Sequence, residues 1–251
     1  TFSINSRSFN NKLRASVLNR VEQNRFYSLS TTVNASANVN VGTLTAPANG
    51  TVLGAAFNIL DQLLDANEFL RSKVGTCGYT GCPDFTVAPK ASVYWEKGFN
   101  PNSYFGGTSG LSFYLPGYSR LFILGGRNGE VDNSDTDHFD QSVILHEYGH
   151  FLEDVEFVSD SPGGPHNGNA IIDPRLAWSE GWGNFFQAAV QAHIIGGGYT
   201  PRYIDTFGND DGSTDMLYLA DLENQVTGND VPTEFTLTGE GNFREFSVTR
   251  L

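Results

Sequence analysis

The stretch His146-Glu147-Tyr148-Gly149-His150 places two imidazoles and one carboxylate within five residues. Histidines four positions apart lie one turn apart on the same helical face, so both rings can reach a single ion. Zinc accepts imidazole nitrogen readily, and catalytic zinc sites leave one position open for water. Glu147 is offset by about 100° from His146 around such a helix, so it borders the ion and can take up a proton from water. The stretch therefore predicts a hydrolytic zinc site on a helix.

The flanking residues predict that this helix is partly buried. An apolar stripe recurs at helical spacing, formed by Ile144, Tyr148, Phe151, Leu152 and Val155. The preceding acidic residues suit the N-cap and the positive end of the helix dipole, and they are Asp135, Asp137 and Asp140. The alternative is an amphipathic helix with two surface histidines. A random H-E-x-x-H would occur roughly 0.005 times in a chain of this length and composition, which favours the metal site.

A site of this type needs a third protein ligand. The metzincin pattern would place a glycine three residues and a histidine six residues after His150, but Glu153 and Glu156 occupy those positions. Without the glycine the helix is expected to continue, which directs Glu156 away from His150. Cys77 and Cys82 are the only cysteines, and we expect them to form a small-loop disulfide rather than to bind the ion. Their alternative, in a cytosolic protein, is a redox or metal pair.

Glu180 is the better candidate for the third ligand. It lies within a second expected helix, which begins at Asp173-Pro174 and ends at Gly196-Gly197-Gly198. The alternative for Glu180 is a carboxylate on the surface of that helix.

Two glycines and an asparagine close to Glu180 support this choice. Gly181 and Gly183 each cost about 1 kcal/mol relative to alanine inside a helix, so they predict that another backbone, such as the metal helix, packs very close. Asn184 is one turn beyond Glu180 and could orient a ligand histidine. Asp154, one turn after His150, is either a similar outer partner or a solvated helix residue.

The sequence H-E-Y-G-H followed by S-E-G-W-G-N-F-F resembles the gluzincin metallopeptidases, in which the third zinc ligand is a glutamate on a later helix. The resemblance covers roughly residues 85–195 and looks most similar to secreted bacterial proteins with a compact HEYGH…SEGW core. It implies that His146, His150 and Glu180 bind zinc, that Glu147 is the general base, and that the substrate is a protein or peptide. Many gluzincins have an aspartate where this chain has Asn184, a departure that leaves the three ligands intact.

The resemblance also implies a fold. We expect an α+β, zincin-like fold with a mostly antiparallel sheet before the metal helix and helices after it. In zincins an edge strand near the metal helix pairs with the extended substrate. Here the last strand before that helix ends at Gly125-Gly126.

A further group is expected to stabilise the oxyanion formed during peptide hydrolysis. The candidates in the C-terminal part are Tyr199, Tyr203, His166, His193 and Arg244, and their spacing does not choose among them. Two other functions stay open. One is a non-catalytic zinc-binding relative that serves adhesion or binding, although metal binding alone does not require Glu147. The other is a non-peptidase hydrolase that uses the same metal helix.

Composition restricts the class of protein and its partners. The 251 residues carry a formal net charge of −13, and no basic cluster is present to neutralise phosphates, so no nucleic acid is expected. No apolar run approaches the roughly 20 residues of a membrane span. The expected disulfide, four lysines and an acidic surface indicate a secreted or extracellular protein. The chain begins at Thr1 and stops in mid-pattern at Leu251, so we expect a processed or truncated chain.

The chain is expected to divide into a β-rich N-terminal segment, residues 1–50, as the tail of an upstream module, and a catalytic domain, residues 51–251. Alternating and periodic patterns predict a helix at 51–74, strands at 26–33, 39–44, 91–95, 111–115 and 121–124, and a short helix at 216–222. The segments 132–137 and 210–215 have carboxylate spacing similar to that of calcium loops, but neither has the twelfth-position glutamate. Solvated turns are favoured there, with calcium as the alternative.

Overall fold

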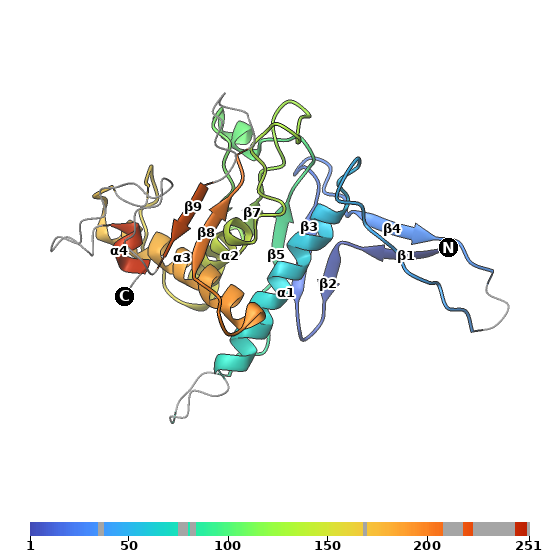
Figure 1. The fold of residues 1–251 in the computed structure, drawn as a ribbon, viewed down its shortest axis with the longest axis horizontal. Helices are drawn as coiled ribbons and strands as arrows, with labels where there is room; N and C mark the ends of the chain where they lie inside the picture. Colours follow the sequence, from blue (N-terminus) through green and yellow to red (C-terminus); the bar gives the residue numbers. More distant parts are fainter. Residues whose placement is uncertain are drawn as a thin grey trace.

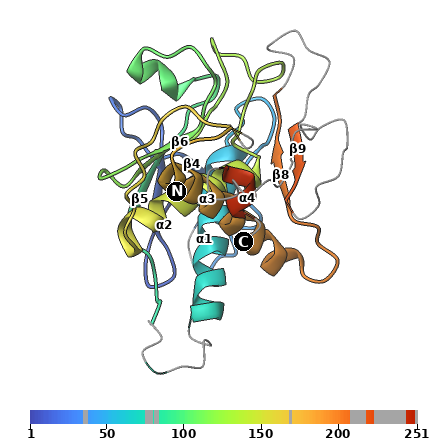
Figure 2. The same cartoon turned by 90° about the vertical axis from the view of Figure 1, so that its left-hand side faces the viewer.

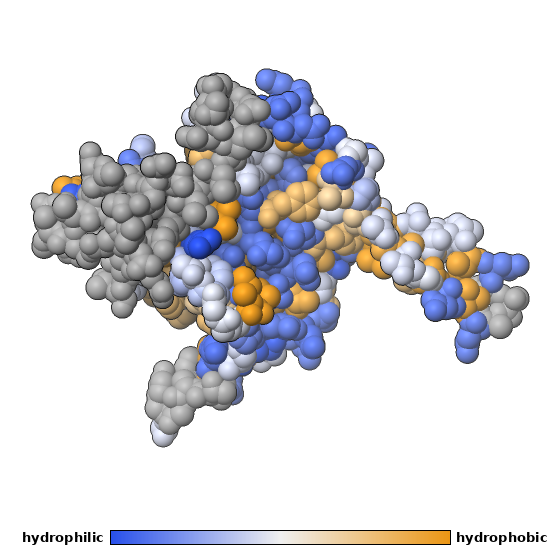
Figure 3. Space-filling view, viewed as in Figure 1, coloured by the Kyte–Doolittle hydropathy of each residue, from blue (hydrophilic) through white to orange (hydrophobic). Residues whose placement is uncertain are grey.

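A computed structural model describes residues 1–34, 38–74, 80, 84–167, 170–207, 218–222 and 244–249. A five-stranded sheet forms the centre of the fold. In spatial order its strands are β2 (Arg7–Phe9), β3 (Arg14–Leu18), β5 (Ala91–Tyr94), β7 (Arg120–Phe122) and β6 (Phe113–Leu115). An antiparallel arm of β1 (Phe2–Asn5) and β4 (Ser28–Thr31) projects from this body (Figure 1). Its exposed apolar side chains include Phe2 and Ile4, and the arm stands clear of the body in Figure 3.

The sheet is mixed. Strands β3, β5 and β7 run parallel, and the edge strands β2 and β6 pair antiparallel to their neighbours. The expected α+β class is confirmed, but the expectation of a mostly antiparallel sheet is wrong. Parallel neighbours need a crossover connection, and the helix α1 (Gly54–Val74) lies between β3 and β5 in the chain.

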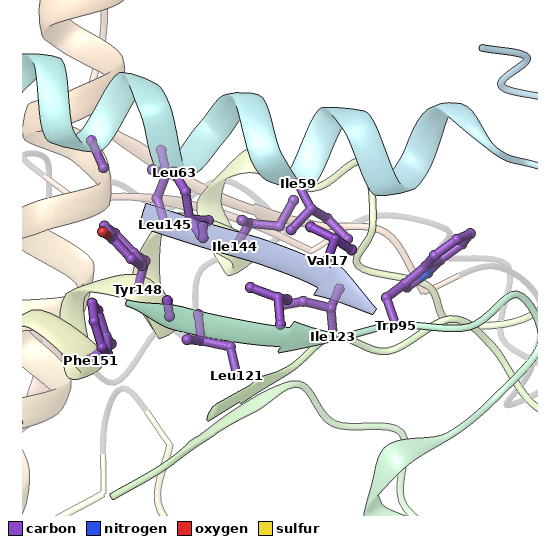
Figure 4. Packing of buried hydrophobic residues seen from close by; sticks show 14 of the residues in the cluster. Val17, Ile59, Leu63, Trp95, Leu121, Ile123, Ile144, Leu145, Tyr148 and Phe151 are labelled. Carbon is purple, nitrogen blue, oxygen red and sulfur yellow. The ribbon is translucent and has the colours of Figure 1, made fainter. Parts of the chain in front are cut away.

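One face of the sheet packs against α1 and α2 (Gln141–Glu156) to form the main core (Figure 4). Val17 and Leu121 from the sheet meet Ile59 from α1 and Ile144 from α2. The apolar stripe predicted on α2 is confirmed, because four of its five members are fully buried and Val155 is partly buried. One face of α2, the helix that carries His146 and His150, is therefore buried against the sheet and α1.

The first 50 residues contribute to this same core. Strand β3 pairs with β5, and Val17 belongs to the main cluster, so residues on both sides of position 50 pack together there. The strand expected at 39–44 is not formed, and the strand expected at 26–33 is restricted to β4.

Beyond the metal helix, α3 (Pro174–Ile195) packs along α2, and the short helix α4 (Glu245–Thr249) packs on α3 (Figures 1 and 2). The predicted limits of α3 are confirmed, with Asp173 as N-cap and Gly196 as C-cap. The helix expected at 216–222 is wrong, because β9 (Tyr218–Asp221) is a strand paired antiparallel with β8 (Arg202–Asp205). Pairing with a distant segment overrides local helical periodicity there. None of the helices in the described part of the chain combines the length and apolar character needed to cross a bilayer.

Candidate metal centre

Three side chains from α2 and α3 bring their ligand atoms together. His146 Nε2 lies 3.1 Å from Glu180 Oε2, and His150 Nε2 lies 3.0 Å from His146 Nε2 and 3.3 Å from Glu180 Oε2. Zinc bonds of about 2.0–2.2 Å in a tetrahedral arrangement separate ligand atoms by about 3.3–3.6 Å. The three residues predicted from sequence thus form a group that could hold a metal ion. Their nitrogen and oxygen donors are ones that zinc accepts, and their separations of 3.0–3.3 Å lie at or just below that range.

Helices α2 and α3 can approach closely enough for this arrangement because glycines, which have no side chain, lie where the two helices cross. A Cβ atom at Gly149 would lie 3.3 Å from Gly183 Cα, and one at Gly183 would lie 2.8 Å from the His146 ring. On the other side of α3, a Cβ at Gly181 would lie 2.6 Å from the Val248 side chain of α4. The close approach predicted for these glycines is confirmed, with two different partners.

Gly183→Ala is expected to weaken the metal site. The added methyl group overlaps the His146 ring, so the ring must shift. Overpacking of this kind costs about 1–3 kcal/mol, against a gain of about 1 kcal/mol in helix propensity. We expect zinc affinity to fall at least about tenfold, by analogy with loss of an outer partner, as measured by competition with a chromophoric chelator. Gly197→Ala is the control, because nothing lies within 4 Å of its added methyl group. Equal affinities for both variants would refute the steric argument.

Each ligand histidine is backed by a polar side chain and a carboxylate. His146 Nδ1 lies 3.0 Å from Asn184 Oδ1, and Asn184 Nδ2 donates to Glu245 Oε1 over 2.7 Å. His150 Nδ1 lies 3.2 Å from Ser179 Oγ, which donates to Glu153 Oε2 over 2.6 Å. These contacts fix the ring planes, so both Nε2 atoms face Glu180.

Of these outer partners, sequence reasoning found only Asn184. Glu153 breaks the metzincin pattern, and its position three residues after His150 places it on the same helix face, which is the sequence signal for its contact with Ser179 beside His150. Asp154 does not act on His150. It accepts hydrogen bonds from Tyr114 Oη and Gly117 N, and so attaches α2 to the loop after β6. Glu156 is exposed at the end of α2, which confirms its rejection as a ligand.

The centre is buried and electrostatically paired. Burial alone would raise the pKa of Glu180, but His150 and hydrogen bonds from His146, His150 and His166 hold it well below its usual value. Burial likewise opposes the charged form of His150, yet Glu180 and Glu153 raise its pKa well above the ordinary value. The carboxylate at position 180 is therefore ionised and ready to bind a cation.

A cavity of about 470 Å³ opens over this group, and Glu147 lines it together with the three candidate ligands. Two of the five candidates for oxyanion stabilisation, His166 and Tyr203, line it as well, and Tyr199, His193 and Arg244 do not. The ring of His193 instead lies 5.7 Å from that of Phe69.

The two lining candidates differ in how they are engaged. His166 Nε2 lies 3.2 Å from Glu180 Oε2, and its Nδ1 lies 3.0 Å from Gly164 O. The ring of Tyr203 lies 6.0 Å from that of His146. Burial, followed by the charges of nearby carboxylates including Asp205, raises the pKa of Tyr203 well above 10, so its phenol keeps its proton at neutral pH.

Three carboxylates lie close together in another part of the same cavity. They belong to Asp135, Asp137 and Asp205 and form a second group that could hold a metal ion. Two of its members come from the segment 132–137 and the third from β8, so the group does not have the spacing of a calcium loop. Ser112 donates a hydrogen bond to Asp137. Calcium at this position stays a prediction, and the segment 210–215 lies outside the described residues.

The acidic residues directly before α2 are expected to cap this helix, but no side-chain cap is formed. Asp140 is the N-cap residue, but its side chain makes no capping hydrogen bond. Its Oδ2 instead accepts from the backbone N and the Oγ1 of Thr206, directly after β8. The acidic residues before the metal helix therefore serve tertiary contacts. The expected disulfide between Cys77 and Cys82 lies outside the described residues.

Asp205→Asn is expected to stabilise the protein as the pH rises. Burial, followed by the charges of Asp135 and Asp140, raises the pKa of Asp205 from 3.8 to about 8. Between these values the folded protein holds a proton that the unfolded chain has released, so the free energy of unfolding falls with rising pH. The variant has no such proton to release. Its free energy of unfolding should therefore rise by more than about 1.4 kcal/mol relative to that of wild type between pH 4 and pH 8. Urea unfolding in EGTA measures it, with Asp132→Asn, an exposed carboxylate, as control. A difference independent of pH would contradict it.

No protein-family model matches the chain, and the comparison with curated proteins finds no match.

Proposed function

We propose that the protein is a zinc-dependent peptidase of the gluzincin type, with a zincin-like fold, secreted from the cell. The observation that carries the proposal is the convergence of His146, His150 and Glu180 ligand atoms in a cavity that Glu147 also lines. A site that only binds metal has no need of a carboxylate beside the ligand group, and Glu147 is that carboxylate.

The roles of the residues follow from their positions. His146, His150 and Glu180 would hold a zinc ion, which when bound would polarise a carbonyl group as a Lewis acid and make water more acidic. Glu147 accepts a proton from the attacking water and delivers it to the leaving amine, because it lies in the cavity without belonging to the ligand group. The outer partners Asn184 and Ser179 hold the two imidazoles in place.

The edge of the sheet supports a peptide as the substrate. Strand β6 is an edge strand, and Phe113 and Tyr114 of this strand line the cavity. An extended peptide can add to such an edge by backbone hydrogen bonds while its side chains enter pockets. This arrangement favours cleavage within a peptide chain.

Digestion of a peptide library tests the proposal. The zinc-loaded protein is incubated with unblocked peptides, and the fragments are identified by mass spectrometry. We expect cleavage at internal bonds that stops on chelation and returns on adding zinc. A protein that binds zinc and cuts no peptide would instead support the binding or adhesion function.

Tyr203→Phe is expected to lower kcat by about 10²–10³-fold with little change in zinc affinity, because loss of one oxyanion donor typically costs this much. Tyr203 keeps its phenolic proton and lines the cavity, so it can donate to a developing negative charge. Steady-state kinetics on the best library peptide measures the effect. Tyr199→Phe removes a hydroxyl that does not line the cavity and should leave kcat unchanged. Wild-type kcat in Tyr203→Phe would remove Tyr203 from the reaction.

A further inference from the structure

A continuous line of contacts joins the metal helix to the C-terminal helix α4. His146 Nδ1 is 3.0 Å from Asn184 Oδ1, and Asn184 Nδ2 is 2.7 Å from Glu245 Oε1. All three side chains are buried, with exposures of 7%, 1% and 7%. Helix α4 lies beside α3 (Figure 2). It can approach this closely because Gly181 carries no side chain where Glu245 O and Val248 pack against α3.

Binding of a metal ion by His146 Nε2 would determine the direction of each hydrogen bond in this line. A histidine that binds metal through Nε2 carries its proton on Nδ1, and this proton needs an acceptor. Asn184 meets that need only with its carbonyl oxygen, so its amide group must face away from His146. The atom that receives this amide group is Glu245 Oε1. The orientation of Asn184, and with it the tautomer of His146, therefore depends on an acceptor at position 245.

We propose that Glu245 is a positioning residue of the metal centre, acting through Asn184 to hold His146 with Nδ1 protonated and the Nε2 lone pair directed at the ion. This inference rests on the metal site of the proposed function and not on its hydrolytic activity. Glu245 supplies the acceptor that orients Asn184, and Asn184 links it to His146 because an amide can accept on one side and donate on the other.

The second ligand histidine is arranged in the same way. The Ser179 hydroxyl donates its only proton to Glu153 Oε2, so its oxygen accepts a hydrogen bond from His150 Nδ1. Each imidazole is thus backed by a carboxylate through one neutral side chain. The carboxylate for His150 comes from the metal helix itself, whereas that for His146 comes from a segment about 100 residues further along the chain. Docking of α4 is thereby coupled to metal affinity.

The test removes the carboxylate at position 245 and then introduces one at position 184. Glu245→Gln keeps the shape of the side chain but replaces an acceptor-only carboxylate by an amide that can either donate or accept, so position 245 no longer determines which way Asn184 faces. We expect zinc affinity to fall about 10–100-fold, the usual effect of losing an outer partner. Adding Asn184→Asp puts a carboxylate directly against His146 Nδ1, and the glutamine at 245 can donate to it. The double variant should return to within about threefold of the wild-type zinc affinity. Chelator competition gives the dissociation constants, and the ¹⁵N shifts of the His146 ring report its tautomer.

Each outcome decides a different question. A wild type that binds no zinc overturns both the metal site and this inference. Wild-type zinc affinity in Glu245→Gln overturns the role of Glu245 alone, as does a double variant that stays as weak as the single one, since the effect would then not pass through Asn184. Glu68→Gln, a half-exposed carboxylate of α1, controls for the loss of one negative charge.

Discussion

Glu147→Gln is expected to lower kcat for peptide cleavage by about 10²–10⁴-fold while zinc affinity stays near that of wild type. Glutamine has the shape of glutamate but cannot accept and return a proton, and general-base catalysis contributes this range. Glu147 lines the cavity but lies outside the ligand group, so its loss should not release the ion. Single-turnover kinetics on the best library peptide, with zinc content measured on the same sample, separates the two effects.

Glu156→Gln is the matched control for this experiment. Glu156 belongs to the same helix but is exposed at its last turn, so its variant should cleave at the wild-type rate. Undiminished cleavage by Glu147→Gln would leave the proposed reaction without its base. Loss of zinc from this variant would instead make Glu147 a ligand and would change the donor set.

Glu180→Gln is expected to cost more zinc affinity than any change among the outer partners. The carboxylate supplies the only negative charge of the ligand group, and Oε2 lies within 3.3 Å of both ligand nitrogen atoms. Loss of an outer partner weakens metal binding about 10–100-fold, and loss of a direct, charged ligand should exceed that range. Chelator competition at constant pH measures the change, and peptide cleavage should disappear with the metal.

A second variant guards against misfolding as the explanation. His150→Gln removes another ligand from a different helix, and both variants should lose zinc while keeping wild-type far-ultraviolet circular dichroism. If Glu180→Gln retains zinc affinity within threefold of wild type, Glu180 is not the third ligand. The proposed gluzincin site would then be wrong.

Local sequence predicted the elements that carry the site. The 3.6-residue period of the stripe beginning at Ile144 identified α2, and Asp173 with Gly196 marked the ends of α3. The spacing of His146 and His150 and the glycines around Glu180 were enough to select the three ligands that converge. These signals are readable because each depends on residues within a few turns of one helix.

Other features depended on pairing between distant segments. The region 216–222 has a helical pattern, but β9 forms there because β8 offers a strand partner. The sheet is mixed because α1 provides a crossover between β3 and β5. Asp140, a plausible cap by position, is bound instead by Thr206. In each case a long-range contact outweighed a local preference.

The sequence by itself determined the candidate ligand group: two imidazoles one turn apart and a glutamate framed by glycines. Only the tertiary structure decided what surrounds that group, namely which carboxylates lie behind the histidines, which of the two candidate tyrosines lines the cavity, and that β6 is an edge strand whose residues line it. The reason is physical. A ligand set follows from residue types at helical spacing, whereas hydrogen-bond partners such as Glu245 are brought in by helix packing, which no local pattern records.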